Sequence, residues 1–343
     1  MKRSTRLYIL LVILIIVLTC VAFFGKHLIL TFFSPAAHSN HKGVIDQTTP
    51  ENREAIRLMG IRDAQLEAWS KTWFHNMLRK KYDTHVSGYD IIKTHDSTDY
   101  GENVYSLVIS RNDSIKFRTE IGVTDSMGVE YVLYPLIPNG RKQVIVFEYT
   151  GGAHCCSMYW ILDLADTIHV LYHSDEEETE IGDIGRIYDI DNDGRYEFTQ
   201  YIRSFHYFDK LCGACSPGAD AIFKYSDSLG GFRLANREFP SVNLEAIEKK
   251  KLDVKQFLDT TRVFNQELST ELLGVTLDVL IHYVYAGQDS IGWAHFDRNY
   301  VLPDKAEMKA KIQAVFNTSV VYRDLYPQQR RRRITNGKPP LVG

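Results

Sequence analysis

The stretch DIDNDGRYE (residues 189–197) carries carboxylates at its first, third, fifth and ninth positions. Its sixth residue is glycine, which tolerates a positive φ, so a short turn can fold these oxygens around one hard cation. We predict a Ca²⁺ site here, and a plain Asp/Asn/Gly turn between strands is the alternative. The predicted ligands are Asp189, Asp191, Asp193, Glu197 and, through its backbone carbonyl, Arg195.

The twelfth position of this stretch is Gln200, whereas an EF-hand needs a bidentate glutamate there. Both flanks, 186–190 and 196–203, are rich in strand-forming residues rather than helical in pattern. The sequence therefore predicts a structural cation site within a sheet and not an EF-hand.

The form Asp-x-Asp-x-Asp-Gly-x-x-Glu is followed by a strand and then by AIFKY (221–225) and GFR (231–233). This succession resembles the calcium-loop repeats of FG-GAP/VCBS-type propeller proteins. Members of that family usually repeat the loop once per blade, whereas this chain has one copy. The resemblance implies a structural cation in an extracytoplasmic, often adhesive or recognition, domain, and it implies no catalytic residue.

Around this loop, short segments rich in Val, Ile, Tyr and Phe alternate with Gly, Asn and Asp. The predicted strands are 104–110, 115–120, 130–136, 143–149, 158–163, 168–173, 196–203, 221–225 and 232–235. No helical pattern separates them, which favours an antiparallel sandwich, barrel or propeller-like arrangement over βαβ units.

Helical periodicity appears on both sides of the strand region. A helix is predicted over 52–81, where Trp69, Trp73 and Phe74 lie on one face, more typical of core than of a partner-binding stripe. Further amphipathic helices are predicted over 244–258, 266–285 and 305–316. The predicted class is α+β, with an N-terminal membrane helix, an antiparallel β-rich domain and a C-terminal helical region.

The chain begins with an apolar segment preceded by basic residues. Leu7–Phe24 is uncharged over eighteen residues and follows Lys2, Arg3 and Arg6. This pattern predicts a single-pass signal anchor with a cytoplasmic N-terminus and a periplasmic or extracellular remainder. A cleaved signal peptide and a lipid-anchored Cys20 are the alternatives. The predicted divisions are 1–26 anchor, 27–50 linker, 51–82 helix, 83–240 β-rich domain, 241–326 helical region and 327–343 disordered basic tail.

Four cysteines beyond the anchor form two close pairs, Cys155 with Cys156 and Cys212 with Cys215. In an oxidising compartment two disulfides are expected. A bond between adjacent cysteines is strained, so we expect at least one of the first pair to bond to one of the second. A zinc site with His154 and His206, and a redox Cys-x-x-Cys, are the alternatives.

No nucleophile motif fixes a reaction, and the weak catalytic candidates are Glu148, His154, Asp163 and His206. A net charge of −3 argues against nucleic acid as a partner. The sequence thus favours a membrane-anchored, calcium-stabilised, non-enzymatic protein that recognises a protein or glycan of the cell envelope. An extracytoplasmic hydrolase, with its site near the GGAHCC turn (151–156), is the alternative.

Overall fold

The structure, a computed structural model, describes residues 50–79, 83–97, 103–123, 128–149, 157–174 and 180–327. The chain divides into two compact units, Met1–Ile61 and Arg62–Gly343. Of the first unit, only the helical residues 50–61 are described, and they begin helix α2 (Pro50–Arg79). The predicted anchor lies outside these ranges, and so do the linker except for Pro50 and the basic tail except for Pro327. Among the helices of the described ranges, none is long and apolar enough to cross a bilayer.

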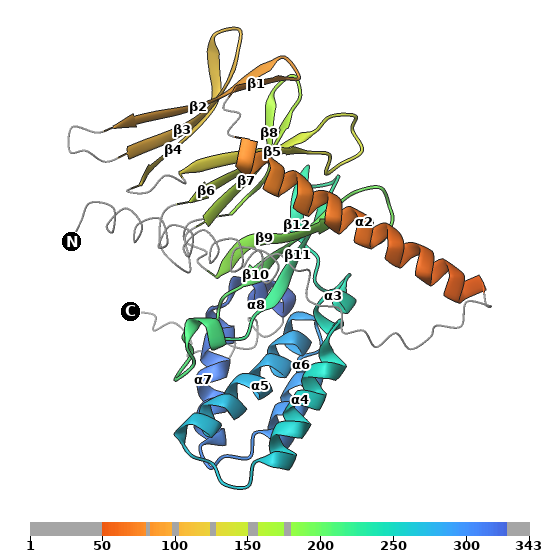
Figure 1. Ribbon diagram of the computed structural model, residues 1–343, viewed down its shortest axis with the longest axis vertical. Helices are drawn as coiled ribbons and strands as arrows, with labels where there is room; N and C mark the ends of the chain where they lie inside the picture. The colour runs from red at the N-terminus through yellow and green to blue at the C-terminus, as the bar shows by residue number, and fades with distance from the viewer. Residues whose placement is uncertain are drawn as a thin grey trace, which may run out of the picture. The chain divides into compact units, whose positions relative to one another are not determined.

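In the described residues of the second unit, the strands form three antiparallel sheets of four strands each (Figure 1). The first sheet comprises β1 (Asp83–Val86), β2 (Tyr89–Ser97), β3 (Asn103–Arg111) and β4 (Ser114–Val123). The second comprises β5 (Val129–Tyr134), β6 (Gln143–Tyr149), β7 (Ser157–Leu164) and β8 (Ile168–His173). The third comprises β9 (Ile181–Tyr188), β10 (Glu197–Ile202), β11 (Ala219–Ser226) and β12 (Gly231–Leu234).

Within each sheet the strands pair in chain order, so each sheet is a meander of hairpins. Such a meander is the unit from which propeller blades are built, although a propeller usually needs about four to eight of them. The three sheets therefore agree with the predicted antiparallel architecture at the level of individual sheets.

Strand β6 is buried on both faces, and this explains its apolar run from Val144 to Phe147. Alternate side chains of a strand point to opposite faces. Ile145 accordingly belongs to the largest core cluster, whereas Val144 and Val146 belong to a second cluster with Ile91 and Leu107 of the first sheet. All five side chains are fully buried. The second sheet thus contributes to two cores at once.

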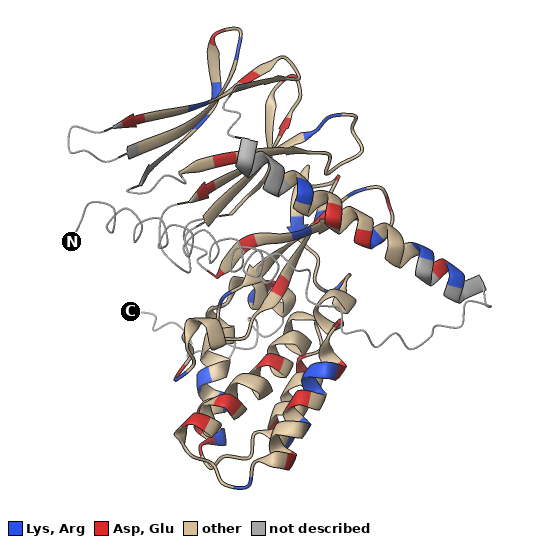
Figure 2. Ribbon diagram, viewed as in Figure 1, with Lys and Arg blue, Asp and Glu red and all other residues tan. Residues whose placement is uncertain are grey.

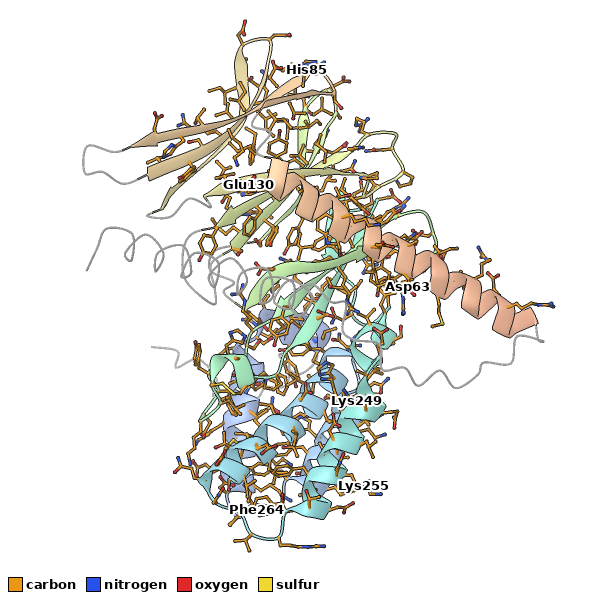
Figure 3. The ribbon with its side chains drawn as sticks, in the orientation of Figure 1. Asp63, His85, Glu130, Lys249, Lys255 and Phe264 are labelled. Atoms are coloured by element: carbon orange, nitrogen blue, oxygen red, sulfur yellow. A yellow bond between two sulfur atoms is a disulfide. The ribbon has the colours of Figure 1, made fainter. Side chains whose placement is uncertain are left out.

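Between the third sheet and residue 327, where the description ends, the chain forms six helices. They are α3 (Pro240–Leu244), α4 (Ile247–Thr260), α5 (Gln266–Tyr285), α6 (Asp289–Asn299), α7 (Lys305–Thr318) and α8 (Val320–Leu325). Helix α4 is amphipathic: Val254 is buried, whereas Lys249 and Lys255 are exposed (Figure 3). Helix α5 carries ten buried residues, which is why its sequence is apolar on most sides.

Acidic and basic residues are interspersed over these helices (Figure 2). Some of them form ion pairs between two helices. Lys250 on α4 contacts Asp278 on α5 at 2.5 Å, and Lys309 on α7 contacts Asp297 on α6 at 2.6 Å. These pairs are partly exposed, so each contributes at most about 1 kcal/mol to stability.

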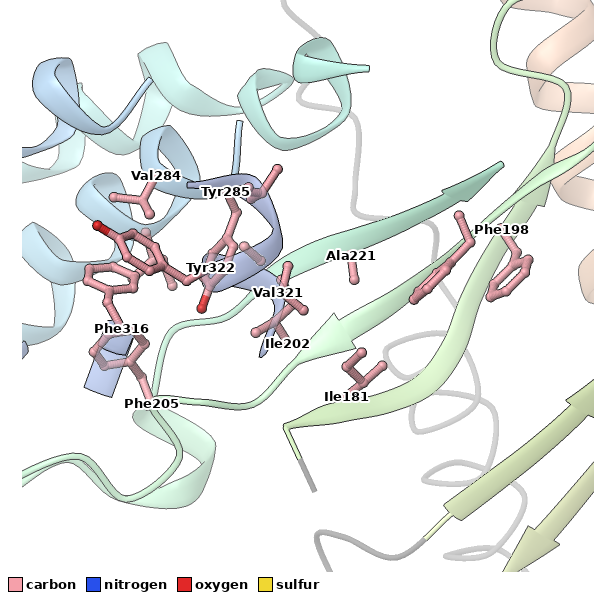
Figure 4. Packing of buried hydrophobic residues seen from close by; sticks show 14 of the residues in the cluster. Ile181, Phe198, Ile202, Phe205, Ala221, Val284, Tyr285, Phe316, Val321 and Tyr322 are labelled. Carbon is pink, nitrogen blue, oxygen red and sulfur yellow. The ribbon is translucent and has the colours of Figure 1, made fainter. Parts of the chain in front are cut away.

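The largest core joins the third sheet to the helices. Phe198 and Ile202 of β10 are buried in the same cluster as Tyr285 of α5, Phe316 of α7 and Tyr322 of α8 (Figure 4). The rings of Phe316 and Tyr322 stack at a centroid distance of 4.9 Å. The strands and helices therefore share one hydrophobic interior.

Asn236 adds a polar link between the same two parts. Its side chain is fully buried; it accepts a hydrogen bond from the Ile222 N–H at 2.8 Å and donates to the Asp220 carbonyl at 2.7 Å. It also donates to the carbonyl of Tyr285 at the end of α5, at 3.0 Å. One side chain thus satisfies backbone groups of both β11 and α5.

The α+β class and all nine predicted strands are confirmed, with bounds that shift by a few residues. The helices predicted over 52–81, 266–285 and 305–316 are also present. Trp69 is 4% exposed and lies in the main core, as predicted. The side chains of Trp73 and Phe74 lie outside what the structure describes.

A candidate metal centre in the β9–β10 loop

The predicted calcium stretch forms the connection between β9 and β10, which pair with each other in the third sheet. Asn192 and Gly194 have positive φ angles of 60° and 84°. The Asp189 carboxylate accepts hydrogen bonds from the N–H groups of Asp193, at 3.0 Å, and Gly194, at 2.9 Å. A tight turn is the result, in which the first residue of the stretch binds the backbone of the fifth and sixth.

Three carboxylates converge in this turn. Asp189, Asp191 and Glu197 each offer one oxygen, and these oxygens lie within 4.8 Å of one another. Over the described residues, this is the one group of three or more His, Cys, Asp or Glu side chains with the spacing of a metal site. Oxygen-only donors of this kind suit a hard cation such as Ca²⁺.

Glu197 is the innermost member of the group. Its side chain is fully buried at the start of β10; its Oε2 accepts a hydrogen bond from the Ile190 N–H at 2.8 Å, while its Oε1 is buried without a hydrogen-bond partner. Burial, together with the nearby Asp191 charge, raises the pKa of Glu197 to about 7. Burial also raises the pKa of Asp189. A buried carboxylate oxygen without a hydrogen-bond donor is stabilised either by protonation or by a nearby cation.

Lys224 of β11 is the cation that the structure places there. Its ammonium nitrogen contacts an oxygen of Asp191 directly and lies 3.1 Å from Asp193 Oδ2 and 3.8 Å from Glu197 Oε1. Burial lowers the pKa of Lys224, but hydrogen bonds to Asp191 and Asp193 outweigh this and raise the pKa above its ordinary value. Lys224 therefore offsets part of the negative charge of these carboxylates, and a metal ion would compete with it for the same oxygens.

The remaining predicted ligands are placed in the turn, but not among the three converging carboxylates. Asp193 Oδ1 accepts from the Arg195 N–H at 2.9 Å, while its other oxygen contacts Lys224. The Arg195 guanidinium bonds to Asp227 at 2.7 Å and lies over the Tyr225 ring. The side chain of Arg195 thus points away from the cluster, as expected for a residue that would contribute only its carbonyl.

Gln200, at the twelfth position, has a structural role in the sheet. Its amide donates to the Gly182 carbonyl at 2.9 Å, and its Oε1 accepts from the Tyr172 hydroxyl. It is fully buried within the strand layer. This position is in agreement with a loop between strands rather than an EF-hand.

Two participants were missed from the sequence, Lys224 and Gln65. The Gln65 side chain on α2 accepts from the Asp189 N–H at 3.1 Å and so fixes the entry to the loop. Both residues come from elements remote in the chain, and neither has a motif. The alternation of side chains along a strand predicts on which face of β11 Lys224 lies. It does not predict which carboxylates lie close to that face.

The weak catalytic candidates are not brought together among the described residues. The β6–β7 register pairs Glu148 with Met158 at one end, whereas Asp163 hydrogen-bonds to Gln143 at the other end, at 3.1 Å. Asp163 also binds Arg141, and together these hydrogen bonds hold its pKa below the ordinary value despite burial. His206 follows β10 in another sheet. His154 lies outside the described residues.

The cysteines correct one prediction. Cys212 and Cys215 form a disulfide with each other, across a Cα–Cα distance of 4.9 Å. The predicted bond from this pair to Cys155 or Cys156 is therefore wrong for these two residues, because each sulfur forms one such bond. The same disulfide removes both sulfurs from the alternative zinc site. Cys155 and Cys156 lie outside the described residues.

Comparisons with protein families and with curated proteins identify no relative of this chain. Neither a scan against protein-family models nor a search of curated proteins returns a match to the chain. The function must therefore be inferred from the residues themselves.

Proposed function

We propose that this protein is a calcium-stabilised recognition protein of the cell envelope, with one Ca²⁺ site in the β9–β10 loop. The observation that carries the cation site is the Oε1 atom of Glu197, which is buried without a hydrogen-bond partner and faces two further carboxylates. Closing a turn around such an oxygen in its ionised form is unfavourable unless a cation compensates it.

The ligand chemistry favours calcium over softer metals. The cluster offers carboxylate oxygens, with neither imidazole nor thiolate among its three members. Asp189, Asp191 and Glu197 would hold the ion, with Asp193 and the carbonyl of Arg195 as further oxygen donors. A divalent ion would offset the carboxylate charges more fully than the single charge of Lys224 does.

The cation would act structurally. Its loop lies between two strands of the third sheet, and Phe198, next to Glu197, is in the main core. A cation that orders this loop would therefore rigidify the sheet edge and prepare it for a ligand at low entropic cost. The placement of the domain outside the cytoplasm rests on the basic-then-apolar pattern of the first 24 residues.

Titration of the calcium-stripped full-length chain in detergent tests the site. Isothermal titration calorimetry should detect one equivalent of Ca²⁺ bound, and Mg²⁺ should bind more weakly, because it dehydrates reluctantly and demands a smaller, octahedral shell. The absence of heat with Ca²⁺, together with an unchanged thermal midpoint in chelator, would contradict the proposed cation site.

The recognition role has a separate test. The labelled full-length chain is applied to an array of envelope glycans and envelope protein fragments, in calcium and in chelator. We expect retention of one ligand class in calcium and its loss in chelator. Release of cleaved fragments from the array would instead indicate a hydrolase and overturn the non-enzymatic role.

A further inference from the structure

The Cys212–Cys215 disulfide lies in a turn that other bonds already hold. Residues Gly213–Cys215 form a single 3₁₀ turn, with the Cys215 N–H bonded to the Cys212 carbonyl at 3.0 Å. Ser216 reinforces the turn: its hydroxyl donates to the Cys212 carbonyl at 2.8 Å and accepts from the Tyr207 N–H at 3.0 Å. These bonds do not involve the sulfur–sulfur link, so the backbone can keep its shape when that link is broken.

The disulfide also contributes little to the stability of the folded chain. It joins residues only three positions apart, and closing so short a loop removes much less entropy from the unfolded chain than closing a long one. Both cysteines are exposed, so a thiolate can approach the bond from solvent. A small contribution to stability combined with open access is typical of a disulfide that exchanges.

A groove beside the Cys212–Cys215 disulfide has room for a segment of a second protein. Cys215 lines a groove of about 1030 Å³ between the Cys212–Gly218 segment and α5. Leu211, Pro217 and Val275 supply apolar wall, and Lys210 lies at the same groove. A volume of this size accommodates several residues of an extended peptide.

The two sulfurs differ in one respect. The Cys212 sulfur accepts a hydrogen bond from the Cys215 N–H at 3.1 Å. An N–H donor stabilises a thiolate, so Cys212 is the better leaving group and Cys215, on the groove, is the sulfur open to attack.

We propose that Cys212–Cys215 is a thiol–disulfide exchange site that oxidises a pair of cysteine thiols in a protein substrate. A substrate thiolate attacks Cys215 Sγ, the Cys212–Cys215 bond breaks, and Cys212 leaves as a thiolate. The second substrate thiolate then attacks the substrate sulfur of the mixed disulfide and releases Cys215. The substrate gains one disulfide, the protein gains two thiols, and no further reactant enters this single exchange.

Trapping under native conditions tests the exchange. The full-length chain is equilibrated in graded mixtures of reduced and oxidised glutathione, alkylated, and mapped by mass spectrometry so that the 212–215 pair is read apart from the other cysteines. We expect this pair to become reduced with little change in circular dichroism or thermal midpoint. A pair that stays oxidised in excess reduced glutathione, or whose reduction unfolds the protein, overturns the proposal.

Single substitutions test the assigned roles. Cys215→Ser leaves the Cys212 thiol with its N–H donor, whereas Cys212→Ser leaves Cys215 without that bond. The pH dependence of alkylation should show a lower thiol pKa in Cys215→Ser. In Cys212→Ser, the Cys215 thiolate should attack a peptide disulfide, release one peptide thiolate and accumulate as a mixed disulfide. The opposite order of the two pKa values would overturn the roles, and failure of both variants to form a mixed disulfide would overturn the exchange.

Discussion

Replacing Glu197 with glutamine should remove most of the stabilisation that calcium gives this protein. At a free Ca²⁺ concentration 100 times its Kd, a ligand that binds only the folded chain adds about 2.7 kcal/mol to the free energy of unfolding. Glu197→Gln keeps the size of the side chain but removes the buried charge that faces Asp189 and Asp191. The measurement is the urea midpoint of wild type and variant, each in calcium and in chelator.

Glu238→Gln is the matched control, because Glu238 is an exposed carboxylate that pairs with Arg233 and takes no part in the loop. It should keep the full calcium-dependent gain. A Glu197→Gln protein that gains as much from calcium as wild type would show that the ion, if bound, does not use this carboxylate.

Lys224→Met tests whether Lys224 and Ca²⁺ compete for the same carboxylate oxygens. The variant keeps an apolar stem of similar length but lacks the ammonium that contacts Asp191, Asp193 and Glu197. It should be less stable than wild type in chelator, because three carboxylates lose their counter-charge, and it should gain more from calcium. An unchanged calcium gain would mean that Lys224 and the ion do not share the oxygens.

Truncating Phe198 to alanine should cost about 3–5 kcal/mol, the usual loss for a fully buried aromatic residue. Phe198 has no exposed surface, and its ring lies 5.0 Å from Tyr172, 4.9 Å from Phe223 and 5.0 Å from Phe232, measured between centroids. Its loss leaves a cavity between the second and third sheets. The free energy of unfolding should be measured by urea denaturation in chelator, so that cation binding does not contribute.

Leu229→Ala serves as the control for this substitution. Leu229 is 68% exposed in the turn before β12, and its truncation should change the stability by no more than about 0.5 kcal/mol. A loss below about 1 kcal/mol for Phe198→Ala would show that this part of the core repacks around the missing ring.

Local pattern was sufficient to predict the long apolar elements. Helix α5 and strand β6 were predicted at the bounds that the structure gives them, because both contain long apolar runs and glycine follows each within two residues. Strand β2 was missed because only Tyr89 and Ile91 mark its buried face with apolar residues. The next two positions on that face are Lys93 and His95, and most side chains after Ile91 are exposed. Where burial is slight, periodicity is a weak signal.

Helix α6 was missed for a different reason. It contains Gly292, which reads as a breaker in sequence. In the structure a Cβ at this position would lie 2.9 Å from the Leu280 carbonyl oxygen of α5. The glycine is therefore required by the close approach of two helices, a long-range contact that no local pattern reveals.

The candidate site also combines features that the local sequence predicts with features that depend on tertiary contacts. The turn and its carboxylates follow from residue type and spacing, because Asp189 folds the loop around itself through bonds to the fifth and sixth residues. The counter-ion Lys224 and the partner of Cys212 depend on which strand or turn lies opposite. These contacts are set by the tertiary structure, and they could not be predicted from the sequence.

The buried amide of Asn236 has a consequence for how the chain unfolds. Because it bonds to β11 and to the last turn of α5, separating these two elements breaks at least one of its buried hydrogen bonds and leaves polar groups unpaired. The third sheet and the helices after it should therefore melt in a single cooperative transition. The change from strands to helices near residue 240 is therefore a boundary of secondary structure only, because a fragment ending there would lack every residue of the largest core cluster from Leu272 to Tyr326.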